Sequence, residues 1–108
     1  EPKFDLKLQK LDGNYILIRV KNNTKATFDR LAVRYSLKNS SGSEVAAKDE
    51  IVYRVMSGKT AYESIYVSSA ADVDISQSSV KITAFDRNPE QKYKVLGKDK
   101  LSVTVTDE

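Results

Sequence analysis

The feature that most restricts the fold of this chain is an alternation of apolar and polar residues with a period of two. In the segment LAVRYSLK, residues 31–38, apolar side chains fall at every second position, and Ile16, Ile18 and Val20 repeat the pattern. Because successive side chains of an extended chain face opposite sides, each segment has one buried and one solvated face. No run of ten or more residues has the spacing of an amphipathic helix. The sequence therefore predicts an all-β fold.

Turn residues separate the alternating segments. Residues 12–14 (DGN) predict a hairpin that pairs a first strand, residues 4–8, with the strand that contains Ile16, Ile18 and Val20. Residues 68–79 are small and polar and predict a crossing loop. Further strands are expected around residues 51–55, 61–67, 80–84 and 101–105, with Tyr93 and Val95 before the last one. About seven short strands at this spacing predict an immunoglobulin-like antiparallel β-sandwich.

The later strands continue the alternation. The fourth runs through Ile51, Tyr53 and Val55, and the sixth runs through Val80, Ile82 and Ala84. In the fifth strand either face could be buried, and Ile65 and Val67 are expected to point inward. With 108 residues and no internal linker, the chain is predicted to form one domain over residues 1–108.

Two absences from the composition restrict the chemistry. The chain has no Cys and no His, which excludes disulfides, thiolate zinc sites, cysteine nucleophiles and proton transfer by imidazole. We therefore expect no enzymatic activity, no cofactor and no metal site. No stretch approaches the roughly 18–20 consecutive apolar residues of a membrane helix, so no membrane span is expected.

The order of these signals resembles the FxLYD family of bacterial immunoglobulin-like domains. The resemblance rests on residues 20–24 (VKNNT), residues 35–39 (YSLKN) at the place of the name motif, Gly42, and Ser57-Gly58 four residues before Tyr62. Lys and Asn stand where the name motif has Tyr and Asp, and Ser57 stands where Pro is frequent. The resemblance implies an extracytoplasmic module of a bacterial surface, lipoprotein or membrane-anchored protein, with no shared catalytic residues.

The leading hypothesis for function is a non-enzymatic interaction or spacer module of the cell envelope. Its partner would be a protein or an anionic envelope polymer. The alternative is a protein-binding domain that adds a strand at a free sheet edge. Binding of that kind is expected to be insensitive to salt, whereas binding through charge falls with it.

The excess positive charge is local. Residues 87–100 hold five basic and two acidic residues, which equals the net charge of +3 of the whole chain. A hairpin bent at Gly97 would gather the lysines into a patch for an anionic partner, although lysines on an edge strand also serve to prevent aggregation. No nucleic-acid recognition module is present. The candidate residues are Arg87, Lys92, Tyr93, Lys94, Lys98 and Lys100.

Tyrosines form a second candidate site. Tyr62 and Tyr66 are four residues apart on one predicted strand, so the alternation places them on the same face. Tyr53 or Tyr15 is expected nearby. Exposed tyrosines suit contact surfaces because they offer a large area and lose little entropy on binding. The other interpretation is burial with a satisfied hydroxyl.

Three short patterns carry weaker hypotheses. Asp72, Asp74 and Ser76 imitate the start of a calcium loop but lack its Gly and its bidentate Glu, which favours ordinary loop solvation. Asp72 with Asp74 or Asp86 is the carboxylate pair on which an enzyme hypothesis would depend. Asn22 and Asn39 fit the glycosylation acceptor pattern, which is short enough to occur by chance.

Overall fold

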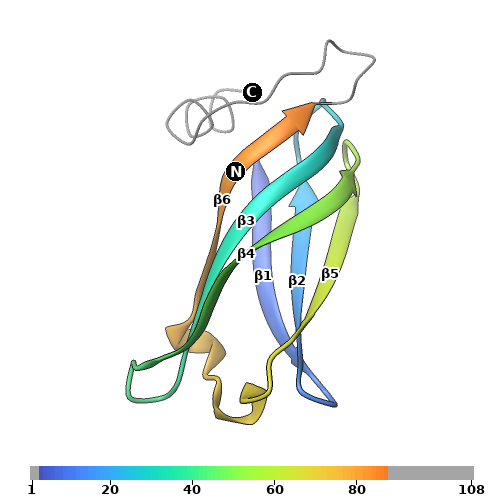
Figure 1. The fold of residues 1–108 in the computed structure, drawn as a ribbon. Coiled ribbons are helices and arrows are strands. Elements are labelled where there is room, and N and C mark those ends of the chain that lie inside the picture. The colour runs from blue at the N-terminus through green and yellow to red at the C-terminus, as the bar shows by residue number, and fades with distance from the viewer. Residues whose placement is uncertain (1–2, 88–108) are drawn as a thin grey trace.

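The computed structural model describes residues 3–87, which form two antiparallel sheets packed face to face (Figure 1). One sheet has the strand order β1-β2-β5 and the other has the order β4-β3-β6. The strands are β1 (Phe4–Leu11), β2 (Tyr15–Asn22), β3 (Phe28–Lys38), β4 (Glu44–Val55), β5 (Thr60–Tyr66) and β6 (Ser79–Arg87). The predicted all-β fold is confirmed, with six strands over the described residues.

The predicted hairpin between the first two strands is present. Leu11 pairs with Tyr15 across the turn, and the backbone there takes φ of 74° at Gly13 and 66° at Asn14. Positive φ is costly for most residues and is tolerated by Gly and Asn. The turn sequence therefore fixes the register of β1 on β2, in which Leu6 pairs with Val20.

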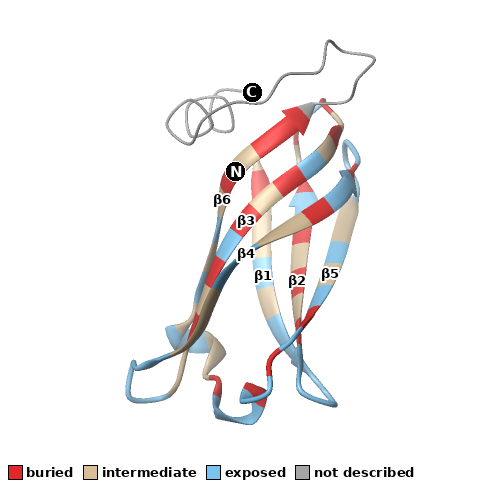
Figure 2. Ribbon diagram, viewed as in Figure 1, coloured by how far each residue is buried: buried red, intermediate tan, exposed pale blue. Residues whose placement is uncertain are grey.

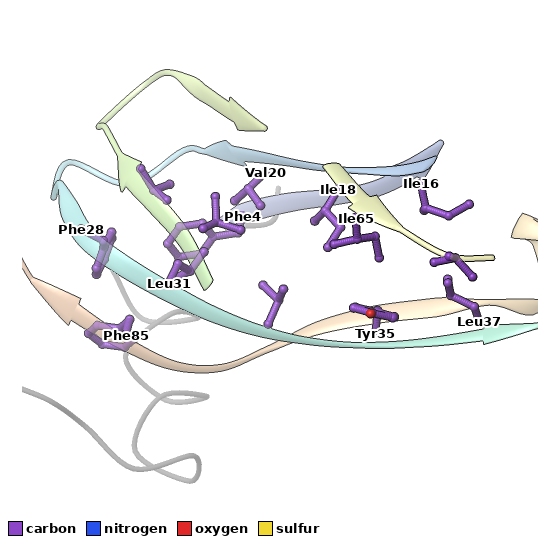
Figure 3. Packing of buried hydrophobic residues seen from close by; sticks show 14 of the residues in the cluster. Phe4, Ile16, Ile18, Val20, Phe28, Leu31, Tyr35, Leu37, Ile65 and Phe85 are labelled. Atoms are coloured by element: carbon purple, nitrogen blue, oxygen red, sulfur yellow. The ribbon is translucent and has the colours of Figure 1, made fainter. Parts of the chain in front are cut away.

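The core lies between the two sheets, where the inward faces of the strands meet (Figures 2 and 3). The predicted inward residues of β2 and β3 are buried, as are Ile65 and Val67. At one end three phenylalanine rings from different strands pack together, with centroids 5.4 Å apart for Phe4 and Phe28 and 4.9 Å apart for Phe28 and Phe85. Burial of this apolar surface is the main favourable term in folding.

The alternation expected through Ile51, Tyr53 and Val55 does not hold along β4, where Ile51 and Tyr53 lie on the outer face. Val52 and Val55 are buried, whereas Tyr53 is 60% exposed on the outer face of its sheet. The physical reason is Arg54, whose φ of 58° breaks the alternation between Val52 and Val55. An irregular residue of this kind shifts every side chain that follows it to the other face.

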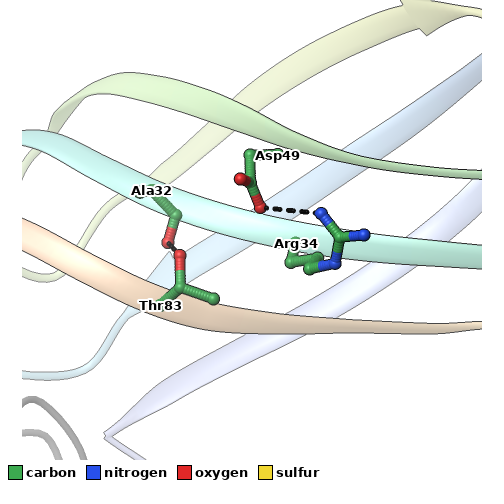
Figure 4. Close-up of polar contacts among 4 residues, drawn as sticks. All are labelled: Ala32, Arg34, Asp49 and Thr83. Atoms are coloured by element: carbon green, nitrogen blue, oxygen red, sulfur yellow. Dashed lines mark hydrogen bonds and ion pairs between the residues drawn. The ribbon is translucent and has the colours of Figure 1, made fainter. Parts of the chain in front are cut away.

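In β6 the expected alternation holds for Val80 and Ile82, which pack against the core, and breaks before Ala84. The register on β3 shifts between Ala32 and Val33, which leaves Thr83 as the extra residue. Figure 4 shows the Thr83 Oγ1 donating to the carbonyl oxygen of Ala32, at 3.4 Å. After the shift Ala84 pairs with Ala32 on the outer face, and Phe85 enters the core in its place.

The predicted crossing loop joins β5 to β6 at the end of the sandwich opposite the phenylalanines. It contains two short 3-10 turns, η1 (Ala70–Asp72) and η2 (Ile75–Gln77). Lys10 of β1 holds this segment, because its Nζ donates to the carbonyl oxygens of Ala71 and Val73 at 3.2 and 2.9 Å. Within residues 3–87, neither 3-10 turn nor any other helix is long and apolar enough to cross a membrane.

Candidate functional site

The outer face of the β1-β2-β5 sheet carries a row of large exposed side chains. The two registers place Tyr15 of β2 directly between Leu11 of β1 and Tyr66 of β5. Their exposures are 39% for Leu11, 42% for Tyr15 and 62% for Tyr66. The rings of Tyr15 and Tyr66 meet edge to face, with centroids 5.6 Å apart and planes at 71°. This geometry is a favourable one for an aromatic pair.

Basic residues continue this face along the same strands. Arg19 of β2 lies between Lys7 of β1 and Tyr62 of β5, and Lys21 pairs with Asp5 in the next row. The Arg19 Nη2 donates to the Gln9 Oε1 at 3.3 Å, which holds the guanidinium across the sheet. We call this surface the tyrosine face and define it by Lys7, Leu11, Tyr15, Leu17, Arg19, Lys21, Tyr62 and Tyr66.

The tyrosine face combines apolar area with hydrogen-bonding and positive groups. Tyr62 is 58% exposed and pairs with Arg19 in the register. Apolar rings with polar tips favour contact with another macromolecule, because they can be covered without leaving a polar group unsatisfied. Three basic side chains against one acidic one, Asp5, give the face a positive charge.

The structure places the predicted site residues in different regions. Tyr62 and Tyr66 are on one face with Tyr15, whereas Tyr53 lies on the outer face of the other sheet, where it pairs with Arg30. Arg87 is the last residue of β6. The other members of the predicted basic patch lie outside the described residues; they are Lys92, Tyr93, Lys94, Lys98 and Lys100. The sequence analysis missed Leu11, Leu17 and Arg19, which only the strand order brings beside the tyrosines.

The weaker candidates take structural roles. Asp74 caps η2, where its Oδ1 accepts from the backbone N and the Oγ of Ser76 at 3.0 and 2.6 Å. These hydrogen bonds are the main cause of the lowered pKa of Asp74, so this carboxylate is a poor proton donor. Asp86 forms an ion pair with Arg30 at 2.5 Å. Among residues 3–87 no three acidic side chains are grouped as a metal site would require.

Asn22 is buried rather than available for modification. Its Nδ2 donates to the carbonyl oxygens of Ala26 and Val55 at 2.8 and 3.1 Å. Its Oδ1 accepts from the N and the Oγ1 of Thr24 at 2.9 and 2.7 Å. The folded chain therefore presents no free Asn22 amide to a glycosylating enzyme.

A second surface feature runs along β4. A hollow of about 240 Å³ opens between β4 and the end of β5. It shares Val45 and Ser69 with a shallower, wider hollow of about 1000 Å³ at the end of the sandwich. The smaller hollow is lined by Tyr35, Val45, Ala46, Lys48, Tyr66, Val67, Ser68 and Ser69.

Two carboxyl groups meet beside this hollow. Glu50 of β4 and Glu63 of β5 face the space between the sheets, since they pair with the inward residues Val33 and Ile18. Burial raises the pKa of Glu63, and the charge of Glu50 and a hydrogen bond with it add to the effect. Burial also raises the pKa of Tyr35, with a further contribution from Glu50.

No protein-family model matches the chain, and no curated protein matches it. Among solved structures, that of IrmA from Escherichia coli is similar, with a TM-score of 0.53. The match covers 92% of this chain and 88% of IrmA at 13% sequence identity. Similarity at this level of identity concerns the fold alone.

Proposed function

We propose that this chain is a non-enzymatic interaction module of a bacterial extracytoplasmic protein and that it binds its partner through the tyrosine face. The single observation that supports this proposal most is the exposure of Tyr15, Tyr62 and Tyr66 on one sheet face. Aromatic residues are enriched where proteins bind one another, and a contiguous exposed patch of large side chains commonly marks an interaction site. The extracytoplasmic location follows from the resemblance to FxLYD domains.

The charge of the tyrosine face favours an anionic partner of the cell envelope. Lys7, Arg19 and Lys21 contribute positive charge on the described part of the chain, and the predicted patch over residues 87–100 would add to it. An anionic wall polymer offers regularly spaced negative groups to such a surface. Contact of this kind has to weaken as salt screens the charges.

The experiment is adsorption of the chain to purified wall polymer at low and physiological salt. A variant with Tyr15, Tyr62 and Tyr66 replaced by Ser is expected to adsorb at least about tenfold less, because even one or two hot-spot aromatics at about 1 kcal/mol each give that loss. Tyr53→Ser is the matched control, because Tyr53 is equally exposed on the opposite sheet. Equal adsorption of the triple variant and the wild type would contradict the proposal.

The predicted basic patch has its own test in the same assay. Replacing Lys92, Lys94, Lys98 and Lys100 by Gln is expected to weaken adsorption and to flatten its salt dependence, because four charges are lost. Lys81→Gln, an exposed lysine of β6, is the control for a general loss of charge. Unchanged adsorption of the fourfold variant would remove this patch from the proposal.

The second candidate function is binding of a protein segment by strand addition. It is supported by the free edge of β4, which pairs with β3 and with no other strand of the described chain. Backbone hydrogen bonds would then supply the affinity. Binding that persists unchanged at high salt would favour this function over contact through charge.

The finer fold assignment is also a proposal. Two three-stranded antiparallel sheets are compatible with an immunoglobulin-like sandwich. The seventh strand expected over residues 101–105 lies outside the described residues.

A further inference from the structure

The first half of β4 is an edge strand without a neighbour on its outer side. Within residues 3–87, the ladder of β4 joins it to β3 alone. In Figure 1 β4 and β5 lie close at the ends joined by their hairpin and diverge toward Glu44 and Tyr66. An edge strand presents a row of backbone N–H and C=O groups that can pair with another chain. The smaller hollow lies along this diverging half of β4.

Tyr35 contributes a polar group to the lining of this hollow. Its side chain is 4% exposed, and its ring lies between the two sheets (Figure 3). In the described part of the chain no residue forms a hydrogen bond with its hydroxyl, and this oxygen is not sealed from solvent. A polar group of a bound partner can therefore reach it through the hollow. Val45, Ala46 and Val67 provide apolar walls around it, which suits an apolar or aromatic side chain entering from outside.

Charged residues follow the hollow along the same face of β4. Ala46, Lys48 and Glu50 alternate on the inward side, since they pair with Leu37, Tyr35 and Val33. Inward-pointing charges on an edge strand normally discourage indiscriminate pairing. Here these charges also determine which charged side chains a selective partner needs at the facing positions. A basic side chain next to Glu50 and Glu63 would be attracted by both carboxyl groups and would offset the repulsion between them.

We propose that the groove between Glu44–Lys48 of β4 and residues 66–69 binds an extended segment of a partner protein, which adds a strand to β4. One apolar side chain of the segment occupies the hollow at Tyr35, and a basic side chain farther along contacts Glu50 and Glu63. This inference rests on strand addition, the second candidate function, and it does not require the tyrosine face. An extended peptide is favoured over a small molecule because it satisfies the strand edge and the hollow together.

The experiment is selection from a displayed library of ten-residue peptides on the full chain. Selected peptides are expected to carry an apolar residue followed or preceded, within about four positions, by Lys or Arg, because side chains on one face of a strand repeat every second residue. In hydrogen exchange, a bound peptide is expected to protect backbone amides of residues 44–48. Proline placed within the pairing segment of a selected peptide should abolish binding, since it removes a backbone donor.

Variants of the chain test the two side-chain contacts separately. Replacing both Glu50 and Glu63 by Gln is expected to lower the affinity for a selected basic peptide about tenfold or more, as loss of a close charge pair does. Asp49→Asn is the matched control, because Asp49 lies on the outer face of the same strand and pairs with Arg34 (Figure 4). Ala46→Phe fills the hollow and is expected to abolish binding of the peptide while the circular-dichroism spectrum stays that of the wild type.

The outcomes separate this inference from the proposed function. A variant with Tyr15→Ser and Tyr62→Ser keeps Tyr66 in the hollow, and it is expected to bind the selected peptide normally while adsorbing poorly to wall polymer. Protection of β1 or β6 instead of β4 would overturn the inference. So would peptides without the basic residue, equal losses for the Glu50/Glu63 and Asp49 variants, or a library that yields no binder.

Discussion

Asn22 shows how one polar side chain closes an end of the sandwich. It is completely buried, and both of its amide hydrogens and both acceptor positions of its oxygen are used. Its backbone is engaged as well, because the Asn22 N donates to the Lys59 carbonyl and the Gly58 N donates to the Asn22 carbonyl. The residue thus joins the β2-β3 loop to the hairpin between β4 and β5. Buried polar networks of this kind stabilise a fold only when every member is satisfied.

Asn22→Ala is expected to lower the free energy of unfolding by about 3 kcal/mol, because it removes four buried hydrogen bonds and leaves the Thr24 N–H without its acceptor. The measurement is urea denaturation followed by circular dichroism. Asn39→Ala is the control, since the Oδ1 of Asn39 accepts three hydrogen bonds in an exposed turn, where water can replace them. A loss for Asn22→Ala no larger than that for Asn39→Ala would show that burial adds nothing.

Glu63 predicts a dependence of stability on pH. Its pKa is raised in the folded chain, so the folded state holds the proton more tightly than the unfolded state does. Stability from this group is present below its unfolded pKa and is lost as pH rises through the folded value. We expect Glu63→Gln to abolish this loss and to be more stable than the wild type at neutral pH. Chemical denaturation of both proteins between pH 4 and pH 8 makes the comparison.

Equal free energies of unfolding for Glu63→Gln and the wild type above neutral pH would contradict this expectation. Asp49→Asn is the control here, because its carboxylate is exposed and forms a surface ion pair with Arg34. Exposed pairs of this type contribute little to stability. The control should therefore follow the wild type across the pH range.

At the scale of the element, β4 is interrupted near both ends. Val45 is the extra residue at the register shift between Leu37 and Lys38, and Arg54 takes a positive φ of 58°. A left-handed conformation costs a residue with a side chain roughly 1–2 kcal/mol. These two irregularities bound the regular part of the edge, residues 46–53.

Arg54→Gly tests this strain. Gly accepts the left-handed conformation but loses more entropy on folding, so we expect a net gain of about 0.5 kcal/mol in the free energy of unfolding. Lys81→Gly, at an exposed position of β6, is expected to lose about that amount or more, because the entropy cost there is not offset. Thermal unfolding of the two variants should shift the midpoint in opposite directions. A loss for both would show that Arg54 is unstrained.

The elements also show what the sequence allowed to be predicted. Strong alternation predicted the buried faces of β2 and β3 correctly, because it is unbroken over residues 16–20 and 31–37. In β4 and β6 the interpretation failed where one residue breaks the period, at Arg54 and at Thr83. Neither residue carries a signal such as Gly or Pro that would mark the break. For this reason Val52 is buried while Tyr53 is exposed, and Phe85 is buried while Ala84 lies on the outer face.

The candidate site was predictable only within single strands. Tyr62 and Tyr66 share a face by alternation alone, so their juxtaposition was expected. Leu11 and Arg19 belong to other strands, and they join the tyrosines only because β5 pairs with β2 rather than with β4. Strand order depends on packing between segments far apart in the sequence, which a local pattern does not report.

At the scale of the whole molecule, both sheets contribute to one core. The buried cluster contains Ile16, Ile18 and Val20 of one sheet together with Leu31, Val33 and Leu37 of the other. The inward apolar face of each sheet is covered by the other sheet alone, so the two sheets should unfold together.

We expect Ile18→Ala and Val33→Ala each to lower the free energy of unfolding by about 2–4 kcal/mol, because each leaves a cavity in the shared core. Both should shift a single transition seen by circular dichroism and by amide exchange. Two separate transitions, or a shift confined to one sheet, would contradict a single cooperative domain.

The uneven placement of the tyrosines has a practical consequence. The chain has no tryptophan, so no indole absorbs energy transferred from the phenols. Of the tyrosines in the described residues, Tyr35 is enclosed, and Tyr15, Tyr53, Tyr62 and Tyr66 are open to water. Ultraviolet emission from the native protein consequently originates largely at its exterior. Occupation of that exterior by another molecule becomes visible as a change in intrinsic fluorescence, without any attached dye.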